Sequence, residues 1–115
     1  YFQEKMIIAI DFDGTIVEHQ YPKIGKPISH AIETILKLSE AGHRLLLWTY
    51  RHGTLLDDAV AYCEDNGIHF YAVNKIHPNE ELIEGASRLI KADVYIDDRN
   101  IGGLPDWLDI QKKLC

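Results

Sequence analysis

Residues 6–12 (MIIAIDF) form an almost continuous apolar run that is interrupted only by Asp11. A run without alternating polar positions is typical of a strand buried on both faces, as in a parallel sheet. Residues 44–49, 68–73 and 93–96 have a similar character. The chain is therefore predicted to build a central sheet from four buried strands.

Segments with helical periodicity separate or follow these strands. They are residues 29–41, 54–66, 78–91 and 104–114. Ser29 and Thr54 are suitable N-caps for the first two, and Pro105 suits the first turn of the last. The alternation of strands and helices predicts an α/β fold, a three-layer, Rossmann-like, doubly wound parallel sheet with helices on both faces.

A chain of 115 residues has the size of one domain. We expect residues 6–115 to form that domain. Residues 1–5 are expected to be a disordered start, since Tyr1-Phe2-Gln3 resembles the remnant of a cleaved purification tag. The two cysteines, Cys63 and Cys115, have no metal-ligand spacing and are expected to be free thiols of a cytoplasmic protein.

Charge and hydropathy constrain the partners of the protein. No apolar run approaches the roughly 20 residues of a membrane span, so no membrane partner is expected. The net charge of −6 disfavours nucleic acid, because a sequence-independent nucleic-acid binder needs a basic surface. Nucleic acid stays open as a partner, however, because carboxylates gathered in a metal site would hide a local basic rim.

Polar residues suited to chemistry lie at the end of each predicted strand. The first strand leads into Asp11-Phe12-Asp13-Gly14-Thr15, the second ends in Thr49, the third is followed by Lys75, and the fourth by Asp97-Asp98. The carboxyl ends of parallel strands lie at one edge of the sheet, where such folds bind their ligands. We therefore expect these carboxylates, the hydroxyl and the ammonium to converge.

A cluster of carboxylates with a single lysine needs a further cation. Like charges about 4 Å apart repel by several kcal/mol at an intermediate dielectric, so the acids destabilise one another without one. Oxygen ligands at an open sheet edge suit Mg²⁺. A Mg²⁺ ion bound by few protein carboxylates keeps coordination positions for water and a substrate phosphate. The sequence thus predicts Mg²⁺ as cofactor and a phosphorylated substrate whose identity stays open.

The same residues resemble the motifs of the haloacid dehalogenase superfamily. Four elements occur in that family's order, namely Asp11-Phe12-Asp13-Gly14-Thr15, an apolar strand ending in Thr49, Lys75, and Asp97-Asp98 after another apolar strand. Together they cover essentially the whole chain. Members that cleave carbon–halogen bonds lack an acid at the position of Asp13, and the transport ATPases carry Thr there. The resemblance therefore implies a phosphatase, or less often a phosphomutase.

The resemblance also implies the roles of the two motif carboxylates. Asp11 would be the nucleophile that takes the phosphoryl group as an aspartyl-phosphate, and Asp13 the general acid and base. Asp13 would first protonate the leaving oxygen and then activate water. The resemblance thus implies a Mg²⁺-dependent phosphomonoesterase. The alternative is a catalytically weak relative, or a phospho-binding module similar to a receiver domain.

A magnesium site follows from the same resemblance. The Asp11 carboxylate, the backbone carbonyl of Asp13 and Asp97 would hold the metal. Asp98 would orient a water on the metal or the active-site lysine. All of these ligands are oxygen atoms, as Mg²⁺ prefers.

Two further motif residues would act on the phosphoryl group. Thr49 would hydrogen-bond a phosphoryl oxygen, and Lys75 would neutralise the charge of the nucleophile and the phosphate. Lys91 also precedes the acidic pair. The sequence favours Lys75, because Lys91 is expected at a helix C-terminus, where a lysine merely complements the helix dipole.

Neither gap between the motifs is long enough for the cap domain of larger relatives. The resemblance therefore implies a capless member with an open site. A lid would have to come from a bulky substrate, from a second copy in a homo-oligomer, or from the loop of residues 16–26, here called the flap loop. His19, Tyr21 and Lys23 are its candidate contacts.

Further substrate contacts are expected beside the motifs. The candidates are Gly14 and Thr15, which close the first motif, and Tyr50 and Arg51, which follow the second. Gly14 is also expected to make the sharp turn that aims both motif carboxylates into one cleft. Arg51 is interpreted either as a bidentate clamp on a substrate anion or as a solvent-facing loop residue.

Overall fold

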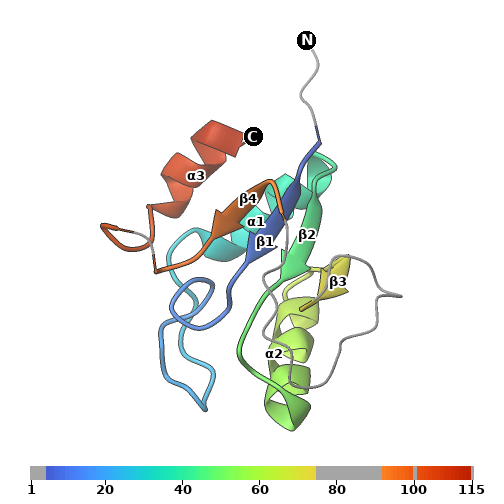
Figure 1. Ribbon diagram of the computed structural model, residues 1–115, viewed down its shortest axis with the longest axis vertical. Coiled ribbons are helices and arrows are strands. Elements are labelled where there is room, and N and C mark those ends of the chain that lie inside the picture. The colour runs from blue at the N-terminus through green and yellow to red at the C-terminus, as the bar shows by residue number, and fades with distance from the viewer. Residues whose placement is uncertain (1–4, 75–91, 100, 115) are drawn as a thin grey trace.

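The computed structural model describes residues 5–74, 92–99 and 101–114 (Figure 1). Its elements are β1 (Ile7–Ile10), α1 (Ala31–Glu40), β2 (Arg44–Leu47), α2 (Gly53–Asp65), β3 (Ala72–Val73), β4 (Val94–Ile96) and α3 (Trp107–Leu114). The strands are all parallel and lie in the order β3-β2-β1-β4. Because β2 and β4 flank β1 on opposite sides, the winding reverses at β1, as in a doubly wound sheet.

The strand β1 is buried on both faces, as its apolar sequence predicts. It pairs with β2 on one side and β4 on the other, so Ile8 lies between Leu45 and Val94. Ile8, Ala9 and Ile10 are at most 1% exposed. The predicted Rossmann-like α/β fold with a parallel sheet is confirmed. No helix in the described part of the chain is long and apolar enough to cross a membrane.

The two faces of the sheet belong to different apolar clusters. Alternate residues of β1 and β2, including Ile8 and Leu45, pack with side chains of α1, α2 and α3. The intervening residues Ala9 and Leu46 form a smaller cluster with Ala72. The described helices thus share one cluster on one face of the sheet. The predicted helix 78–91 lies outside the described residues.

Two N-cap predictions are wrong. The residue before α1 is His30 rather than Ser29, and the residue before α2 is His52 rather than Thr54. Neither histidine side chain makes a capping hydrogen bond. The loop before α1 supplies a backbone acceptor instead, because the Ala31 amide donates to the Ile28 carbonyl at 3.0 Å.

The last helix also begins later than predicted. Pro105 precedes α3 and does not lie in its first turn. The residue that caps this helix is Asp106, whose carboxylate accepts a hydrogen bond from the Leu108 amide at 2.8 Å. An Asp side chain in this position satisfies an amide that has no partner within the helix.

The strands are shorter than the apolar runs that predicted them. β2 ends at Leu47 because the Thr49 amide donates to the side chain of Asn74 at 2.7 Å, outside the ladder. β3 begins only at Ala72, and the first residue of its predicted run closes α2 instead, since the Ile68 amide donates to the Cys63 carbonyl at 2.9 Å. Hydrogen-bond partners outside the ladder therefore take up amides of the predicted strands.

Candidate active site

The carboxyl ends of β1, β2 and β4 meet at one edge of the sheet. A cavity of about 340 Å³ lies there, lined by Asp11, Asp13, His19, Tyr21, Thr49, Tyr50, Arg51, Asp98 and Arg99. A smaller adjoining cavity of about 50 Å³ is shared by Asp11, Thr49 and Asp97. The structure thus brings together four predicted carboxylates and the predicted hydroxyl. Lys75 and Lys91 lie outside the described residues.

A tight turn after β1 aims the first motif at this cavity. The ring of Phe12 is fully buried, while Asp11 and Asp13 on either side of it line the cavity. The Phe12 carbonyl accepts hydrogen bonds from the amides of Thr15 and Ile16 at 3.2 and 3.0 Å. Gly14 adopts a left-handed φ of 79°. The expected sharp turn at Gly14 is therefore present.

The backbone of Gly14 is in close contact with Asp98. A Cβ atom at residue 14 would lie only 2.3 Å from Oδ2 of Asp98. The absence of a side chain at Gly14 therefore lets the carboxylate from the end of β4 approach the turn that follows β1. This contact ties together two segments that supply carboxylates to the site.

The predicted substrate contact is wrong for the Thr15 side chain. Thr15 is fully buried, and its hydroxyl has no hydrogen-bond partner among the described residues. Its carbonyl accepts a hydrogen bond from Nε1 of Trp107, in α3, at 3.0 Å. Thr15 therefore attaches the motif turn to the last helix instead of facing the cavity.

Burial and mutual repulsion act on the Asp11 carboxylate. Removal from water is the largest effect and, with the charges of Asp98, Asp13 and Asp97, it raises the pKa of Asp11 from 3.8 to about 6. The hydrogen bond from the Phe12 amide to Oδ1 of Asp11, at 2.8 Å, opposes this rise. The raised pKa of Asp11 thus reflects mainly its burial, with smaller contributions from the charges of the other three carboxylates.

This pKa predicts a stability change with pH in the metal-free protein. Asp11 ionises near pH 3.8 when unfolded and near pH 6 when folded, so stability falls as pH rises between these values. Asp11→Asn stays neutral and should be more stable than the wild type at pH 7, by about 1–2 kcal/mol after solvent screening. Denaturant unfolding with chelator at pH 4 to 7 measures this difference, which should vanish near pH 4. Equal stabilities at pH 7 would contradict it.

The donor atoms of the site fit the magnesium ion that the motifs imply. Within the described residues, no three His, Cys, Asp or Glu side chains surround a common point. The predicted set uses only two carboxylates, from Asp11 and Asp97, and the Asp13 carbonyl. Mg²⁺ is typically bound by few carboxylates and completes its shell with water and phosphate oxygens. The oxygen atoms of Asp11, Asp13 and Asp97 are thus of the kind that Mg²⁺ prefers.

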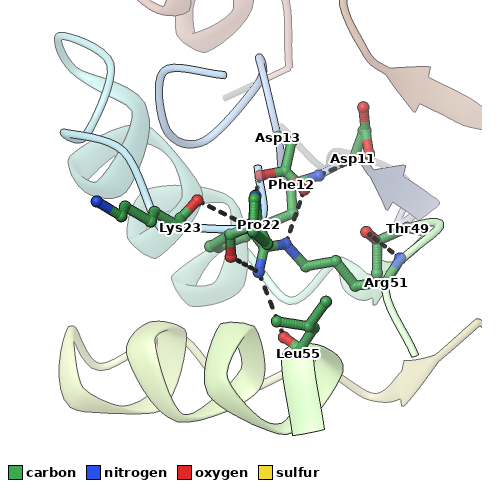
Figure 2. A network of polar contacts seen from close by, with 8 residues as sticks. All are labelled: Asp11, Phe12, Asp13, Pro22, Lys23, Thr49, Arg51 and Leu55. Atoms are coloured by element: carbon green, nitrogen blue, oxygen red, sulfur yellow. Dashed lines mark hydrogen bonds and ion pairs between the residues drawn. The ribbon is translucent and has the colours of Figure 1, made fainter. Parts of the chain in front are cut away.

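Arg51 is neither a solvent-facing residue nor a free clamp for a substrate anion. Its side chain is only 1% exposed, and its guanidinium forms a bidentate ion pair with Asp13 (Figure 2). It also donates to the backbone carbonyls of Pro22 and Lys23 in the flap loop. Of the loop residues predicted to contact substrate, His19 and Tyr21 line the cavity, whereas the Lys23 carbonyl binds Arg51.

Two residues that the motifs do not include complete the site. Asn74 has a left-handed φ of 55°, and its side-chain oxygen accepts the Thr49 amide. Arg99 lies over the exposed ring of Tyr50, 4.7 Å from its centroid, and Nη1 of Arg99 donates to Oη of Tyr50 at 3.1 Å. An Asn directly after the third predicted strand was a usable signal, since Asn tolerates left-handed backbone.

A solved structure of a conserved protein from Bacteroides thetaiotaomicron closely matches this chain. The two are 53% identical, the match covers 95% of this chain and 88% of the other, and the TM-score is 0.87. The chain belongs to the same family as that protein. The likeness to the Bacteroides thetaiotaomicron protein supports the parallel α/β fold described above. No protein-family model matches the chain, and neither does any curated protein.

Proposed function

We propose that the protein is a Mg²⁺-dependent phosphomonoesterase of the haloacid dehalogenase type. The observation that carries this proposal is the gathering of Asp11, Asp13, Asp97 and Asp98 around two adjoining cavities at the carboxyl edge of the sheet, both of which Asp11 lines. A cluster of carboxylates that destabilises its central member is unfavourable for folding alone. It becomes favourable when a cation and an anionic substrate bind there together.

The reaction uses the two carboxylates of the turn after β1. Oδ1 of Asp11 accepts the Phe12 amide, which leaves Oδ2 to attack the phosphorus atom. As the new O–P bond forms, the bond to the leaving oxygen breaks, and Asp13 gives that oxygen a proton. Water then attacks the phosphorus of the aspartyl-phosphate and loses a proton to Asp13. Asp11 and inorganic phosphate are released, and Asp13 is protonated for the next cycle. While Asp13 carries this proton, its ion pair with Arg51 has to be weakened, because a neutral carboxyl group no longer attracts the guanidinium as a charge.

The remaining residues orient and neutralise the phosphoryl group. Asp11, the Asp13 carbonyl and Asp97 would hold Mg²⁺, which supplies positive charge that offsets the phosphoryl oxygens. Thr49 lines the cavity, and its hydroxyl accepts the Arg51 amide at 3.2 Å, so its proton is free to be donated to a phosphoryl oxygen. Lys75 is proposed as the cation beside the nucleophile.

Metal removal tests this function. With p-nitrophenyl phosphate as substrate, the purified protein should release phosphate in Mg²⁺ and lose this activity in excess EDTA. Readdition of Mg²⁺ above the EDTA concentration should restore it, because the metal offsets charge that the carboxylates cannot. A Ca²⁺ readdition is the control for a non-specific effect of divalent ions on folding. Turnover that persists in EDTA would contradict the proposal.

A further inference from the structure

We propose that Arg51 is a positioning residue that couples the flap loop to the Asp13 side chain. Its effect on the reaction rests on the proposed function, in which Asp13 is the acid and base. The coupling itself is a property of the fold and can be measured without any substrate. The argument starts from the hydrogen bonds of the guanidinium group.

One side of the guanidinium is committed to Asp13. Nε of Arg51 donates to Oδ2 and Nη2 donates to Oδ1, each at 2.7 Å. The Asp13 side chain is 13% exposed and that of Arg51 is 1% exposed, so water competes little for either group. Two parallel charge-assisted hydrogen bonds fix the plane of the carboxylate as well as its place.

The other donors of the guanidinium hold the flap loop and α2. Nη2 donates to the Lys23 carbonyl at 3.0 Å, and Nη1 to the Pro22 carbonyl at 3.3 Å. Nη1 also reaches the Leu55 carbonyl, in the first turns of α2, at 3.5 Å. A guanidinium has five N–H donors. The two bonds to Asp13 and the three bonds to backbone carbonyls use all five.

Ring stacking adds a second link between the loop and the motif turn. Cζ of Arg51 lies 5.1 Å from the ring centroid of Phe12 and 5.2 Å from that of Tyr21. Phe12 belongs to the turn that carries both carboxylates, whereas Tyr21 belongs to the flap loop and lines the cavity. Figure 2 shows the guanidinium between Asp13, the Pro22–Lys23 backbone and Leu55.

A movement of the flap loop therefore changes the bonds that orient Asp13. Lysine cannot replace Arg51 in this role, because its ammonium has three donors at one point and cannot span a carboxylate and separate carbonyls. The flap loop also brings His19 and Tyr21 to the cavity. Through Arg51, the position of Asp13, the proposed acid, is linked to that of the flap-loop residues that line the cavity.

Hydrogen–deuterium exchange of the full chain tests the coupling directly. The Glu18 amide bonds to the Lys26 carbonyl at 2.8 Å, and the Lys23 amide to the Gln20 carbonyl at 2.9 Å, so both report loop opening. In Arg51→Lys, and equally in Asp13→Asn, exchange of these amides should rise roughly tenfold to hundredfold, as for loss of charge-assisted hydrogen bonds. The matched control is Arg44→Lys, whose guanidinium stacks on Tyr71 away from the cavity. In Arg44→Lys, the exchange rates of the Glu18 and Lys23 amides should stay within about twofold of those in the wild type.

A leaving-group comparison tests the consequence for Asp13. An alkyl phosphate needs the proton from Asp13 more than p-nitrophenyl phosphate does, because p-nitrophenolate leaves without one. Arg51→Lys should therefore lower kcat/KM roughly 10- to 100-fold for glycerol phosphate and only a few fold for p-nitrophenyl phosphate. A merely structural role would lower both equally. In a protein that already carries Asp13→Asn, Arg51→Lys should lower kcat/KM for glycerol phosphate little further.

The outcomes separate this proposal from the proposed function. If the flap-loop amides of Arg51→Lys exchanged as slowly as those of the wild type, the coupling would be overturned. It would also be overturned if their exchange rose in Arg51→Lys but not in Asp13→Asn. Equal losses for the two substrates would overturn the role in positioning the acid. A wild-type protein without phosphatase activity, combined with coupled loop exchange, would overturn the proposed function and leave the coupling supported. Thermal unfolding and circular dichroism show that each variant is folded.

Discussion

Asp11→Asn should leave a folded protein with almost no phosphatase activity. The amide has nearly the shape of the carboxylate and still accepts the Phe12 amide bond, but it cannot attack phosphorus. We expect kcat to fall by roughly 10⁴-fold or more, as for loss of other covalent nucleophiles. Steady-state release of phosphate from p-nitrophenyl phosphate in Mg²⁺ measures the effect.

Stability separates this loss from unfolding. The metal-free variant should be more stable than the wild type at pH 7, because a negative charge that is buried and repelled by its neighbours is gone. Asp13→Asn is the matched comparison, because it keeps the nucleophile. It should slow both the transfer of the phosphoryl group to Asp11 and the hydrolysis of the aspartyl-phosphate, by about 10²- to 10⁴-fold. Turnover by Asp11→Asn within tenfold of wild type would exclude the proposed aspartyl-phosphate. A stable phosphorylated wild-type protein without turnover would instead favour the phospho-binding alternative.

Gly14→Ala should lower both activity and stability. A left-handed φ of 79° costs an L-residue about 1–2 kcal/mol, and the added Cβ would lie 2.3 Å from Oδ2 of Asp98. The carboxylate, the turn or both must therefore shift. A displacement of this size at the catalytic carboxylates should reduce kcat/KM about 100-fold. Kinetics with p-nitrophenyl phosphate and thermal unfolding together measure the two effects.

The chain offers a matched control for the contact with Asp98. Gly102 also has a left-handed φ, of 89°, but a Cβ there would meet nothing within 4 Å among the described residues. Gly102→Ala should therefore show the backbone strain alone, with a similar loss of stability and nearly unchanged kcat/KM. If both variants lost activity equally, the close approach of Asp98 to Gly14 would have no role in the site.

The gathering of the motif residues could be predicted because it depends on a short-range pattern. An apolar run such as that of β1 has to be buried, and the acid that follows it has to lie at the strand end. Parallel pairing then brings Asp11, Thr49 and Asp97 to one edge, since β2 and β4 flank β1. Element boundaries were less predictable, because the Thr49 amide leaves the ladder for the side chain of Asn74.

The role of Arg51 could not be predicted from its neighbours in the sequence. Its position after the second motif suggested either a substrate clamp or a solvent-facing residue, and it is neither. Its partner Asp13 is 38 residues away in the chain. Thr15 was likewise predicted at the substrate because it belongs to a motif, but the packing of Trp107 against its carbonyl buries it.

The sequence by itself determined which segments become buried strands and which acids stand at their ends. These properties follow from the apolar pattern along the chain and from the geometry of parallel strands. Only the tertiary structure decided that Arg51 binds Asp13, that Thr15 is buried and that Asp98 lies against Gly14. Each of these contacts joins atoms of segments that are distant in the sequence. A pattern of neighbouring residues cannot predict which distant atoms will lie within a few ångströms of one another.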